Sequence, residues 1–460
     1  MSESRSSAPR VLIIGAGTGG LCLAHGLRRD GIDVSVFERE RTRTDGLHGY
    51  RVGIDPDGSR ALRACLPPDL FATFVATRAR APRYFNILTE HLSEVLSLPI
   101  PEELDPVRSE KSVSRMTLRQ ILLTGLEDAV HFDKTLTRYE QHPDTTVTAY
   151  FADGSSVTGD LLVGADGTSS RVRQQHLPHA RLEDSGILGI AGKVPLTDET
   201  KELLPAKAFY GISIVMAPRG YSCILHVMEF PWDRNGIKPG IGTTDAEPIA
   251  RWPGLLFDNT RDYLMWGVSA ASSRFPADVM SRRGGDLIEL ALGLTDTWHT
   301  NLRSLIRLSE PDSCFPLNIR TSAPIAPWPS SNVTLIGDAI HTMTPGRGVG
   351  ANTALRDAAL LCANLTAVRK HRMDLVAAVR DYEAQMIAYG FAAVRSSRQQ
   401  MDGNGLIHKP LVGRVALEGM RAGMRMANRL PPVKQRMIDG LQRERGADRE
   451  VSGGAVVASG

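Results

Sequence analysis

The stretch Arg10–Glu40, RVLIIGAGTGGLCLAHGLRRDGIDVSVFERE, decides the fold. Its apolar start, Val11–Ile14, has the length and composition of a buried parallel strand. The glycine-rich segment Gly15–Gly20 follows directly, and the next residues repeat apolar side chains at helical spacing. A turn ends that helix, and Val34–Phe37 is predicted as a second strand followed by Glu38. The order of strand, glycine-rich turn, helix and strand is typical of the βαβ unit that binds dinucleotides.

Each residue of this motif has a physical role in the prediction. Gly15 allows the tight turn, Gly17 lets the backbone approach a pyrophosphate, and Gly20 lets the helix pack closely on the strand. The N-terminus of the helix offers unpaired N–H groups to the phosphates. Glu38 is placed to bind ribose hydroxyls, and its charge disfavours a 2′-phosphate there. The motif alone does not distinguish NAD from FAD, and an ordinary βαβ turn is the alternative to a dinucleotide site.

The composition indicates a globular protein with more than one packed unit. The chain has 460 residues, of which 42% are hydrophobic and 23% are charged. Its net charge of +3, from 54 basic and 51 acidic residues, predicts neither a nucleic-acid surface nor a membrane field. Without a signal-peptide core or a bilayer-length apolar run, we expect a cytoplasmic protein. The five scattered cysteines predict reduced thiols, and no spacing suggests a metal site.

Two later segments also end a predicted strand where a ligand could bind. The buried strand Leu161–Gly164 leads to Asp166-Gly167, just before a Ser/Thr-rich helix start, although a plain turn is the favoured explanation of this pair taken alone. The strand Val333–Ile336 leads to Gly337-Asp338. Pro345–Gly350 then opens a helix, and its glycines let the backbone lie against a flat ligand. The positive end of that helix would stabilise a ring that becomes anionic on reduction.

Three other regions complete the sequence-based prediction. Arg115 and Arg119 lie on one side of a predicted helix, Arg115–Leu126, where they could reach phosphates or simply form a solvated basic face. Alternating segments between Gly186 and Trp266 predict a largely antiparallel sheet with one face free to form a ligand wall. The residues after Val368 are predicted to be helical and increasingly basic. A solvated surface helix is favoured there over one that touches a membrane or a partner helix.

The three motifs, in this order, resemble those of the single-component FAD-dependent aromatic hydroxylases, the group A flavoprotein monooxygenases related to para-hydroxybenzoate hydroxylase. The resemblance covers about Val11–Leu361. It implies an α/β fold, α+β overall, in which a glutathione-reductase-type Rossmann FAD domain is interleaved with a mainly antiparallel substrate sheet and followed by a helical C-terminal part. The implied segments are 9–80, 108–185 and 300–365 for the FAD domain, 81–107 and 186–299 for the substrate domain, 366–445 for the C-terminal helices, and 446–460 for a disordered tail.

The resemblance also implies a set of cofactor-binding residues, in which Arg115 is favoured over Arg119 for contact with FAD. This set comprises Gly15, Gly17, Gly20, Glu38, Arg51, Arg115, Arg119, Asp166, Gly167, Asp338, Gly348, Gly350, Ala351 and Asn352. The first three hold the pyrophosphate, Glu38 holds the adenosine ribose, and the last four approach the isoalloxazine ring. The sequence GRGVGA between Pro345 and Asn352 departs from the commoner family form, a glycine pair followed by Gln-Gly and a larger apolar residue. This departure bears on flavin mobility or substrate access.

The implied chemistry is reduction of FAD by NADPH or NADH, capture of O₂ as a C4a-hydroperoxyflavin, and oxygen transfer to an electron-rich carbon. The protein would orient the substrate and keep water from the peroxide. A base could help to deprotonate a phenol, and His226 and Tyr210 are weak candidates for that role. Since the predicted sheet shows no charged clamp, we expect a bulky, largely apolar aromatic or polyketide-like substrate of secondary metabolism, which is hydroxylated or epoxidised.

Other functions of the same fold remain as alternatives. One is an FAD reductase or desaturase-like enzyme, another is a Baeyer–Villiger oxygenase, and a third is a non-catalytic protein that binds FAD structurally. We expect small molecules and O₂ as partners, with no nucleic acid and no membrane. The sequence leaves open the substrate, its site of oxidation, the choice between NADH and NADPH, and the choice between monomer and homodimer.

Overall fold

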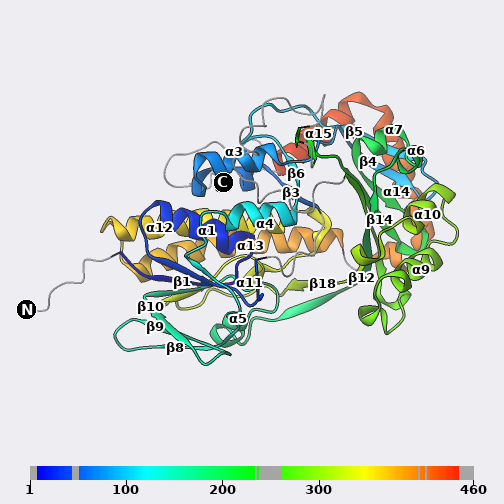
Figure 1. Ribbon diagram of the computed structural model, residues 1–460. Coiled ribbons are helices and arrows are strands. Elements are labelled where there is room, and N and C mark those ends of the chain that lie inside the picture. The colour runs from blue at the N-terminus through cyan, green and yellow to red at the C-terminus, as the bar shows by residue number, and fades with distance from the viewer. Residues whose placement is uncertain are drawn as a thin grey trace, which may run out of the picture.

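A computed structural model describes residues 8–43, 51–233, 236–237, 262–401, 403, 405–409 and 412–444. The predicted disordered tail, 446–460, lies outside these residues. Two large sheets organise the described chain, with helices packed on each and a helical C-terminal part beside the second (Figure 1). The predicted fold class is confirmed.

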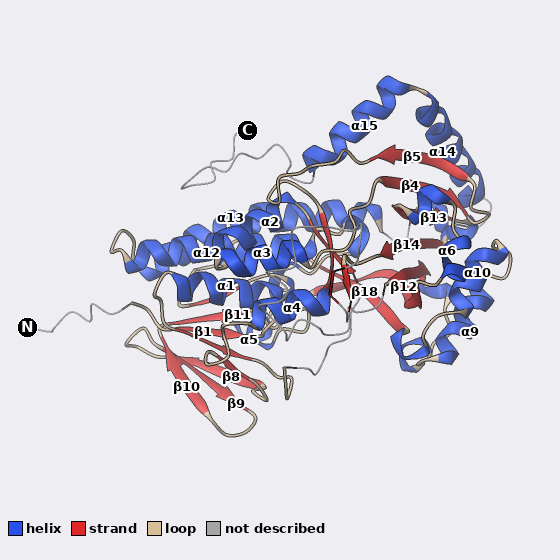
Figure 2. Cartoon of the chain, turned by 45° about the horizontal axis from the view of Figure 1, so that its top comes forward, coloured by secondary structure: helices blue, strands red, loops and turns tan. Residues whose placement is uncertain are grey.

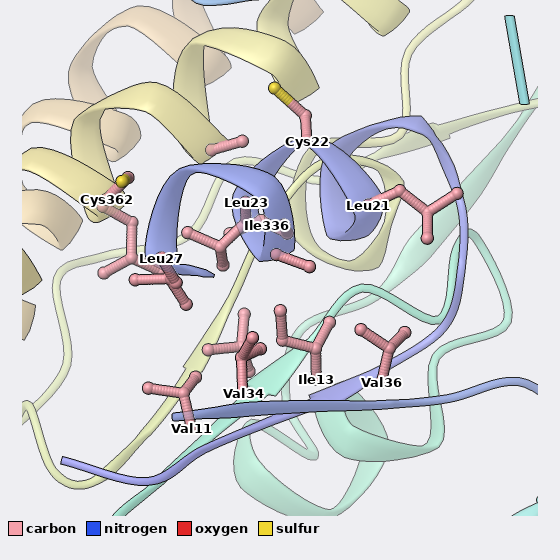
Figure 3. Close-up of a cluster of buried hydrophobic side chains, with 14 of the residues drawn as sticks. Val11, Ile13, Leu21, Cys22, Leu23, Leu27, Val34, Val36, Ile336 and Cys362 are labelled. Carbon is pink, nitrogen blue, oxygen red and sulfur yellow. The ribbon is translucent and has the colours of Figure 1, made fainter. Parts of the chain in front are cut away.

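The first sheet is built from the strands that carry the three motifs. It has five parallel strands in the order β19 (Val333–Leu335), β11 (Leu161–Gly164), β1 (Val11–Ile14), β2 (Val34–Phe37) and β7 (Val130–His131). Parallel strands are covered on both faces, which explains why β1 is entirely apolar. Val11 and Ile13 point toward the helix that carries Leu23 and Leu27 (Figure 3). The carboxyl ends of β1, β11 and β19 therefore meet at one edge of the sheet.

Helices cover one side of this sheet and a small sheet covers the other (Figures 1 and 2). The small sheet is an antiparallel meander of β8 (Leu136–Gln141), β9 (Val147–Phe151) and β10 (Ser156–Gly159). The helices of this part are α1 (Thr18–Arg29), α2 (Pro56–Cys65), α3 (Pro68–Ala76), α4 (Arg115–Leu123), α5 (Arg171–His176), α11 (Asp338–His341), α12 (Gly350–Arg369) and α13 (Leu375–Gln400).

The second sheet has seven strands and is antiparallel except for one pair. Its order is β18 (Phe315–Ser322), β12 (Leu182–Pro195), β17 (Tyr263–Ala271), β14 (Ser222–Met228), β13 (Gly211–Met216), β4 (Tyr84–Thr89) and β5 (Glu94–Pro99), with β13 and β4 parallel. Its back face packs on α9 (Gly285–Leu294) and α10 (Thr300–Arg307) through residues such as Leu225 and Trp266. The opposite face, which carries Ile212 and Ile224, is called the front face, and the sequence predicts a ligand wall on a free face of this kind. β18, which the predicted segments place with the FAD domain, pairs with β12 in this sheet.

Shorter elements connect and flank the two sheets. The antiparallel ribbon of β3 (Arg51–Ile54) and β6 (Lys111–Ser114) lies between them. The remaining short elements are α6 (Asp198–Glu202), α7 (Ala206–Phe209), β15 (Trp232–Asp233) and β16 (Gly236–Ile237).

The C-terminal helices α14 (Val412–Arg429) and α15 (Pro431–Glu444) cover the edge strand β5. The backbone N–H of Ser97 donates to Asn428 Oδ1 at 3.2 Å, so an edge-strand donor is satisfied by a helix side chain. The buried Arg421 pairs with Glu90. The predicted solvated basic face of a surface helix is therefore wrong only for Arg421, since the other arginines of α14 are exposed and Met426 on the same helix is 62% exposed.

No helix in the described ranges combines the length and apolar character that crossing a membrane requires.

Candidate active site

The glycines of the first motif lie where β1 turns into α1, against the second motif. Gly15 has a φ of +106°, and a Cβ there would lie 2.4 Å from the carbonyl oxygen of Ala165. A Cβ on Gly20 would lie 2.3 Å from the Gly15 carbonyl oxygen, so the predicted close packing of helix and strand has a geometric basis. At Gly17 the nearest atom would be 4.0 Å away. The backbone at Gly17 is therefore open to a ligand phosphate at the start of α1.

The acidic end of β2 and one arginine of α4 meet beside this turn. Glu38 is buried, and its Oε2 accepts a hydrogen bond of 2.7 Å from the N–H of Ala16. Arg119 donates from Nε to the Ala16 carbonyl at 3.4 Å, and its Nη2 lies 3.7 Å from Glu38 Oε2. Arg115 is exposed at the start of α4 and attracts Asp338 electrostatically. The two arginines therefore lie near different motifs, Arg119 near the first and Arg115 near the third.

The carboxylate of Asp166 caps the helix that follows it. Its Oδ2 accepts hydrogen bonds from the N–H groups of Arg171 at 2.7 Å and Val172 at 3.3 Å. Burial raises the pKa of Asp166 above its ordinary value. These two backbone N–H groups at the start of the helix are thus hydrogen-bonded within the protein and not available to a ligand. Gly167 has a φ of +75°, and a Cβ there would have no described atom within 4 Å, so its backbone is open.

A residue that sequence reasoning missed joins the second and third motifs. Arg173 is 4% exposed and donates from Nη1 to the Ala339 carbonyl and from Nη2 to the Thr168 carbonyl, both at 2.9 Å. These two bonds hold the loop after β11 against the turn after β19. Nothing in the local pattern distinguishes Arg173 from the neighbouring arginine at position 171, because its partner lies far along the chain.

The third motif is held from behind by a buried carboxylate on α12. Asp357 Oδ2 accepts hydrogen bonds of 2.7 Å from the Gly337 N–H and from His341 Nε2, and Oδ1 accepts one of 2.6 Å from the Tyr389 hydroxyl. Burial alone would lower the pKa of His341, but the charge of Asp357 and its hydrogen bond raise it above the ordinary value. This network fixes Gly337, whose φ is +61°, and leaves the side chain of Asp338 exposed.

The glycine-rich turn before α12 faces the second sheet across a cavity of about 90 Å³. Arg51 on β3, Gly348 in the turn, and Ile212 and Ile224 on the sheet line this cavity. Gly348 has a φ of +65°, and a Cβ there would have no atom within 4 Å. The turn therefore presents bare backbone and the N-terminal end of α12 toward an apolar wall.

The last predicted residues of the set lie at the start of α12, where Gly350 and Ala351 form the first turn. The side chain of Asn352 is 3% exposed and does not stand free in the cavity. Its Nδ2 donates to the Gly53 carbonyl at 2.9 Å, and its Oδ1 accepts from the Asp55 N–H at 3.1 Å. Asn352 therefore joins the helix start to β3, and its side chain is already satisfied by the protein.

The two candidate bases occupy different environments. His226 is 2% exposed on the front face of the sheet, directly opposite Ile212 of the cavity wall, and neither ring nitrogen has a hydrogen-bond partner among the described residues. Burial, together with the charges of Arg51 and Arg80, lowers the pKa of His226 well below its ordinary value. Tyr210 is 38% exposed, and its ring lies 4.4 Å from the Arg80 guanidinium. The geometry therefore favours His226 over Tyr210.

Lys111 is a buried cation in the cavity wall that sequence reasoning also missed. It is 1% exposed, and its Nζ donates to the Ser109 carbonyl at 2.8 Å and to Ser59 Oγ at 3.1 Å. Burial, and then the nearby Arg78, lower the pKa of Lys111 to about 7, against the opposing charges of Asp105, Glu110 and Asp55.

Replacing Lys111 by methionine is expected to stabilise the fold, and more strongly at low pH. Burial disfavours the charged form of Lys111 in the folded state. Between pH 7 and 10.5 the unfolded chain therefore binds more protons than the folded one, so the free energy of unfolding of the wild type rises with pH through that window. At pH 6 the folded wild type bears the full cost of burying the charged lysine, so K111M should raise the free energy of unfolding by on the order of 3 kcal/mol. Urea unfolding at pH 6 and pH 10 measures this difference. An equal effect at both pH values would contradict the assigned burial of the charge.

Among the described residues, no group of three or more His, Cys, Asp or Glu side chains could hold a metal ion.

Comparison with known proteins agrees with this geometry. Residues 310–392 match a family model described as an FAD binding domain, and residues 13–75 match an NAD(P)-binding Rossmann-like domain. A solved structure from Photorhabdus luminescens subsp. laumondii TTO1, provisionally described as an FAD-containing monooxygenase, is 32% identical with a TM-score of 0.72. The match covers 85% of this chain and 98% of that one.

Two curated fungal proteins are also similar. The dual O-methyltransferase/FAD-dependent monooxygenase CTB3 of Cercospora beticola is 33% identical over 412 residues, which is 83% of this chain but 44% of that protein. The chain thus spans less than half the length of this relative. The FAD-dependent monooxygenase thnD of Trichoderma harzianum is 28% identical, with 87% of this chain and 95% of that protein covered. With the motifs, the fold and these relatives in agreement, the chain belongs to the family of single-component FAD-dependent monooxygenases.

Proposed function

We propose that this protein uses NADPH or NADH and O₂ to hydroxylate or epoxidise a bulky, largely apolar aromatic or polyketide-like small molecule. One observation carries the proposal. The bare backbone at Gly348 faces the apolar residues Ile212 and Ile224 across a single cavity. A flat cofactor against that backbone would meet a substrate held on the sheet.

The residues of the three motifs fit FAD. The open backbone at Gly17 and the N-terminus of α1 suit the pyrophosphate, with the positive charge of Arg119 beside them, and Arg115 supplies positive charge near the third motif. Glu38 suits a ribose hydroxyl, and Asp338 is exposed where it can bind the ribityl chain. When bound, FAD supplies electron transfer from the nicotinamide and activation of O₂.

The chain itself contributes position, exclusion of water and charge stabilisation. The apolar side chains of Ile212 and Ile224 on the front face of the second sheet can orient a ring and keep water away from the reacting centre. The positive end of α12 stabilises negative charge next to Gly348. His226 can accept a hydrogen bond from a phenolic hydroxyl at a ring nitrogen, because neither nitrogen has a partner among the described residues. The cost of burying an unpartnered imidazole favours a polar ligand group as its partner.

His226→Phe is expected to lower kcat/KM for a phenolic substrate about 10- to 100-fold while leaving the bound FAD content unchanged. Tyr210→Phe is the matched control and should change kcat/KM less than about twofold, because its ring lies on Arg80. Steady-state kinetics over pH 5–9, with the flavin content measured for each variant, checks both. Equal losses for both variants, or none for His226→Phe, would remove His226 from the mechanism.

The proposal also includes the domain assignment, a cytoplasmic location and a monomeric or homodimeric state without nucleic-acid partners. The near-neutral net charge of +3 supports the absence of a nucleic-acid partner. Light scattering of the purified protein distinguishes monomer from homodimer, and a larger assembly would contradict both.

Anaerobic mixing of the FAD-loaded protein with NADH or NADPH tests the proposal, with and without members of an aromatic polyketide panel. We expect bleaching of the flavin absorbance by one or both nicotinamides, accelerated by the compound that the enzyme oxidises. Flavin that neither nicotinamide reduces, whatever compound is present, would indicate a non-catalytic binding protein. A purified protein that is colourless and takes up no FAD would contradict the proposal altogether.

A further inference from the structure

The apolar wall of the candidate active site continues beyond the cavity beside Gly348. On β13, Ile212 lies directly opposite Phe85 of β4, and Phe85 lies opposite Leu98 of β5. In the same way, Ile87 of β4 lies opposite Leu96 of β5. Residues directly opposite one another share a face of the sheet, so one apolar surface runs from the active-site cavity to the edge strand.

A second cavity, of about 360 Å³, lies over the far end of this surface. The sheet side chains Phe85, Ile87, Leu96 and Leu98 form its floor, and Met424 of α14 with Met437 and Leu441 of α15 form its roof. No charged or polar side chain lines it in the described part of the chain. Its volume falls within the range of small-molecule sites.

Phe85 lines both cavities, so its partly buried ring borders the roofed cavity as well as the active-site cavity. The roof is anchored: Arg421 of α14 pairs with Glu90 and donates to the Met216 carbonyl, and Asn428 donates to Glu94 Oε1 at 3.0 Å. The methionines that complete the roof have flexible, unbranched side chains that adapt to an apolar ligand.

We infer that the cavity between β4–β5 and α14–α15 binds the apolar part of the small-molecule substrate that lies away from the reacting carbon. This inference rests on the proposed function, since it takes the cavity beside Gly348 as the place of reaction. The occupant is an alkyl chain or fused-ring portion of the same molecule. It reaches the roofed cavity past Phe85, and its burial there contributes affinity and selects for length.

A series of 4-alkylphenols, from 4-ethylphenol to 4-octylphenol, serves as the probe, with binding to the FAD-loaded protein measured by isothermal titration calorimetry. Affinity should rise about three- to fourfold with each added methylene until the cavity is filled. Met424→Trp fills the roofed cavity and should abolish this rise while changing 4-ethylphenol binding less than about twofold. Met426→Trp is the matched control, since Met426 is 62% exposed on the same helix, and should keep the full rise.

Phe85→Ala, which removes the ring that borders both cavities, provides a second test that does not depend on the folding of Met424→Trp. In Phe85→Ala, affinity should continue to increase up to longer alkyl chains than in the wild type. The melting temperature of each variant verifies its fold. Affinity that does not depend on chain length, or equal behaviour of the two tryptophan variants, would overturn the inference. Calorimetry reports binding alone. The proposed function therefore fails separately, through flavin that no nicotinamide reduces, even if the chain-length series succeeds.

Discussion

Gly15→Ala is expected to destabilise the protein by roughly 2–5 kcal/mol and to abolish FAD binding. The new Cβ would lie 2.4 Å from the Ala165 carbonyl oxygen and 2.9 Å from Asp166 Cα, so backbone on the second motif would have to move. The φ of +106° adds conformational strain for any side chain. Because the clash joins two motifs, one methyl group would displace both from the positions that suit the cofactor.

Gly17→Ala is the matched control for this effect. Its φ is −82° and its nearest neighbour would be 4.0 Å away, so the apoprotein should melt within a few degrees of the wild type. FAD affinity should still fall, by on the order of 100-fold, because the methyl group occupies the space where the pyrophosphate approaches the backbone. Thermal unfolding without FAD and fluorescence titration with FAD separate the two effects. Wild-type melting of Gly15→Ala, or wild-type FAD affinity of Gly17→Ala, would contradict these assignments.

Asp357→Ala is expected to cost about 3–5 kcal/mol of folding free energy. The carboxylate is fully buried and accepts three hydrogen bonds, from Gly337, His341 and the partly buried Tyr389, so its loss leaves three donors without this partner. The turn that presents Asp338 would also lose its support, and FAD affinity should fall with stability.

Two milder variants distinguish the network from a general packing defect. Asp357→Asn keeps an acceptor oxygen and should lower the free energy of unfolding less than Asp357→Ala does. Tyr389→Phe removes one hydrogen bond and should lower it by about 1 kcal/mol. Urea unfolding of the three variants gives this order. If Tyr389→Phe proved as costly as Asp357→Ala, the carboxylate would not be the centre of the network.

The parts of the fold that could be predicted from the sequence are those fixed by local pattern. The strand Val11–Ile14, the following glycines and the helix after them form one contiguous signal, and the structure has all three. The alternating segments between Gly186 and Trp266 likewise predicted a largely antiparallel sheet, in which β14 is one strand. Local patterns succeed here because each element is specified by its own periodicity.

The remaining features depend on partners far along the chain. Arg421 reads as one cation of a basic helix, yet it is buried because Glu90, 331 positions away, lies beside it. The side chain of Asn352 stood among the predicted flavin contacts, and only the structure shows that Gly53 and Asp55 occupy its polar groups. Side-chain partners of this kind carry no local periodicity, so sequence reasoning could not predict these hydrogen bonds.

The central claim is that the protein transfers one oxygen atom from O₂ to its substrate. Oxidation under ¹⁸O₂ of the compound that accelerates flavin reduction tests this claim most directly. Turnover with the preferred nicotinamide, followed by mass spectrometry of the product, should show one ¹⁸O atom on a carbon of the aromatic or polyketide skeleton. Label within a new ester or lactone would instead show Baeyer–Villiger insertion. An oxidised or reduced product that carries no ¹⁸O would contradict the monooxygenase account and favour a reductase or desaturase of the same fold.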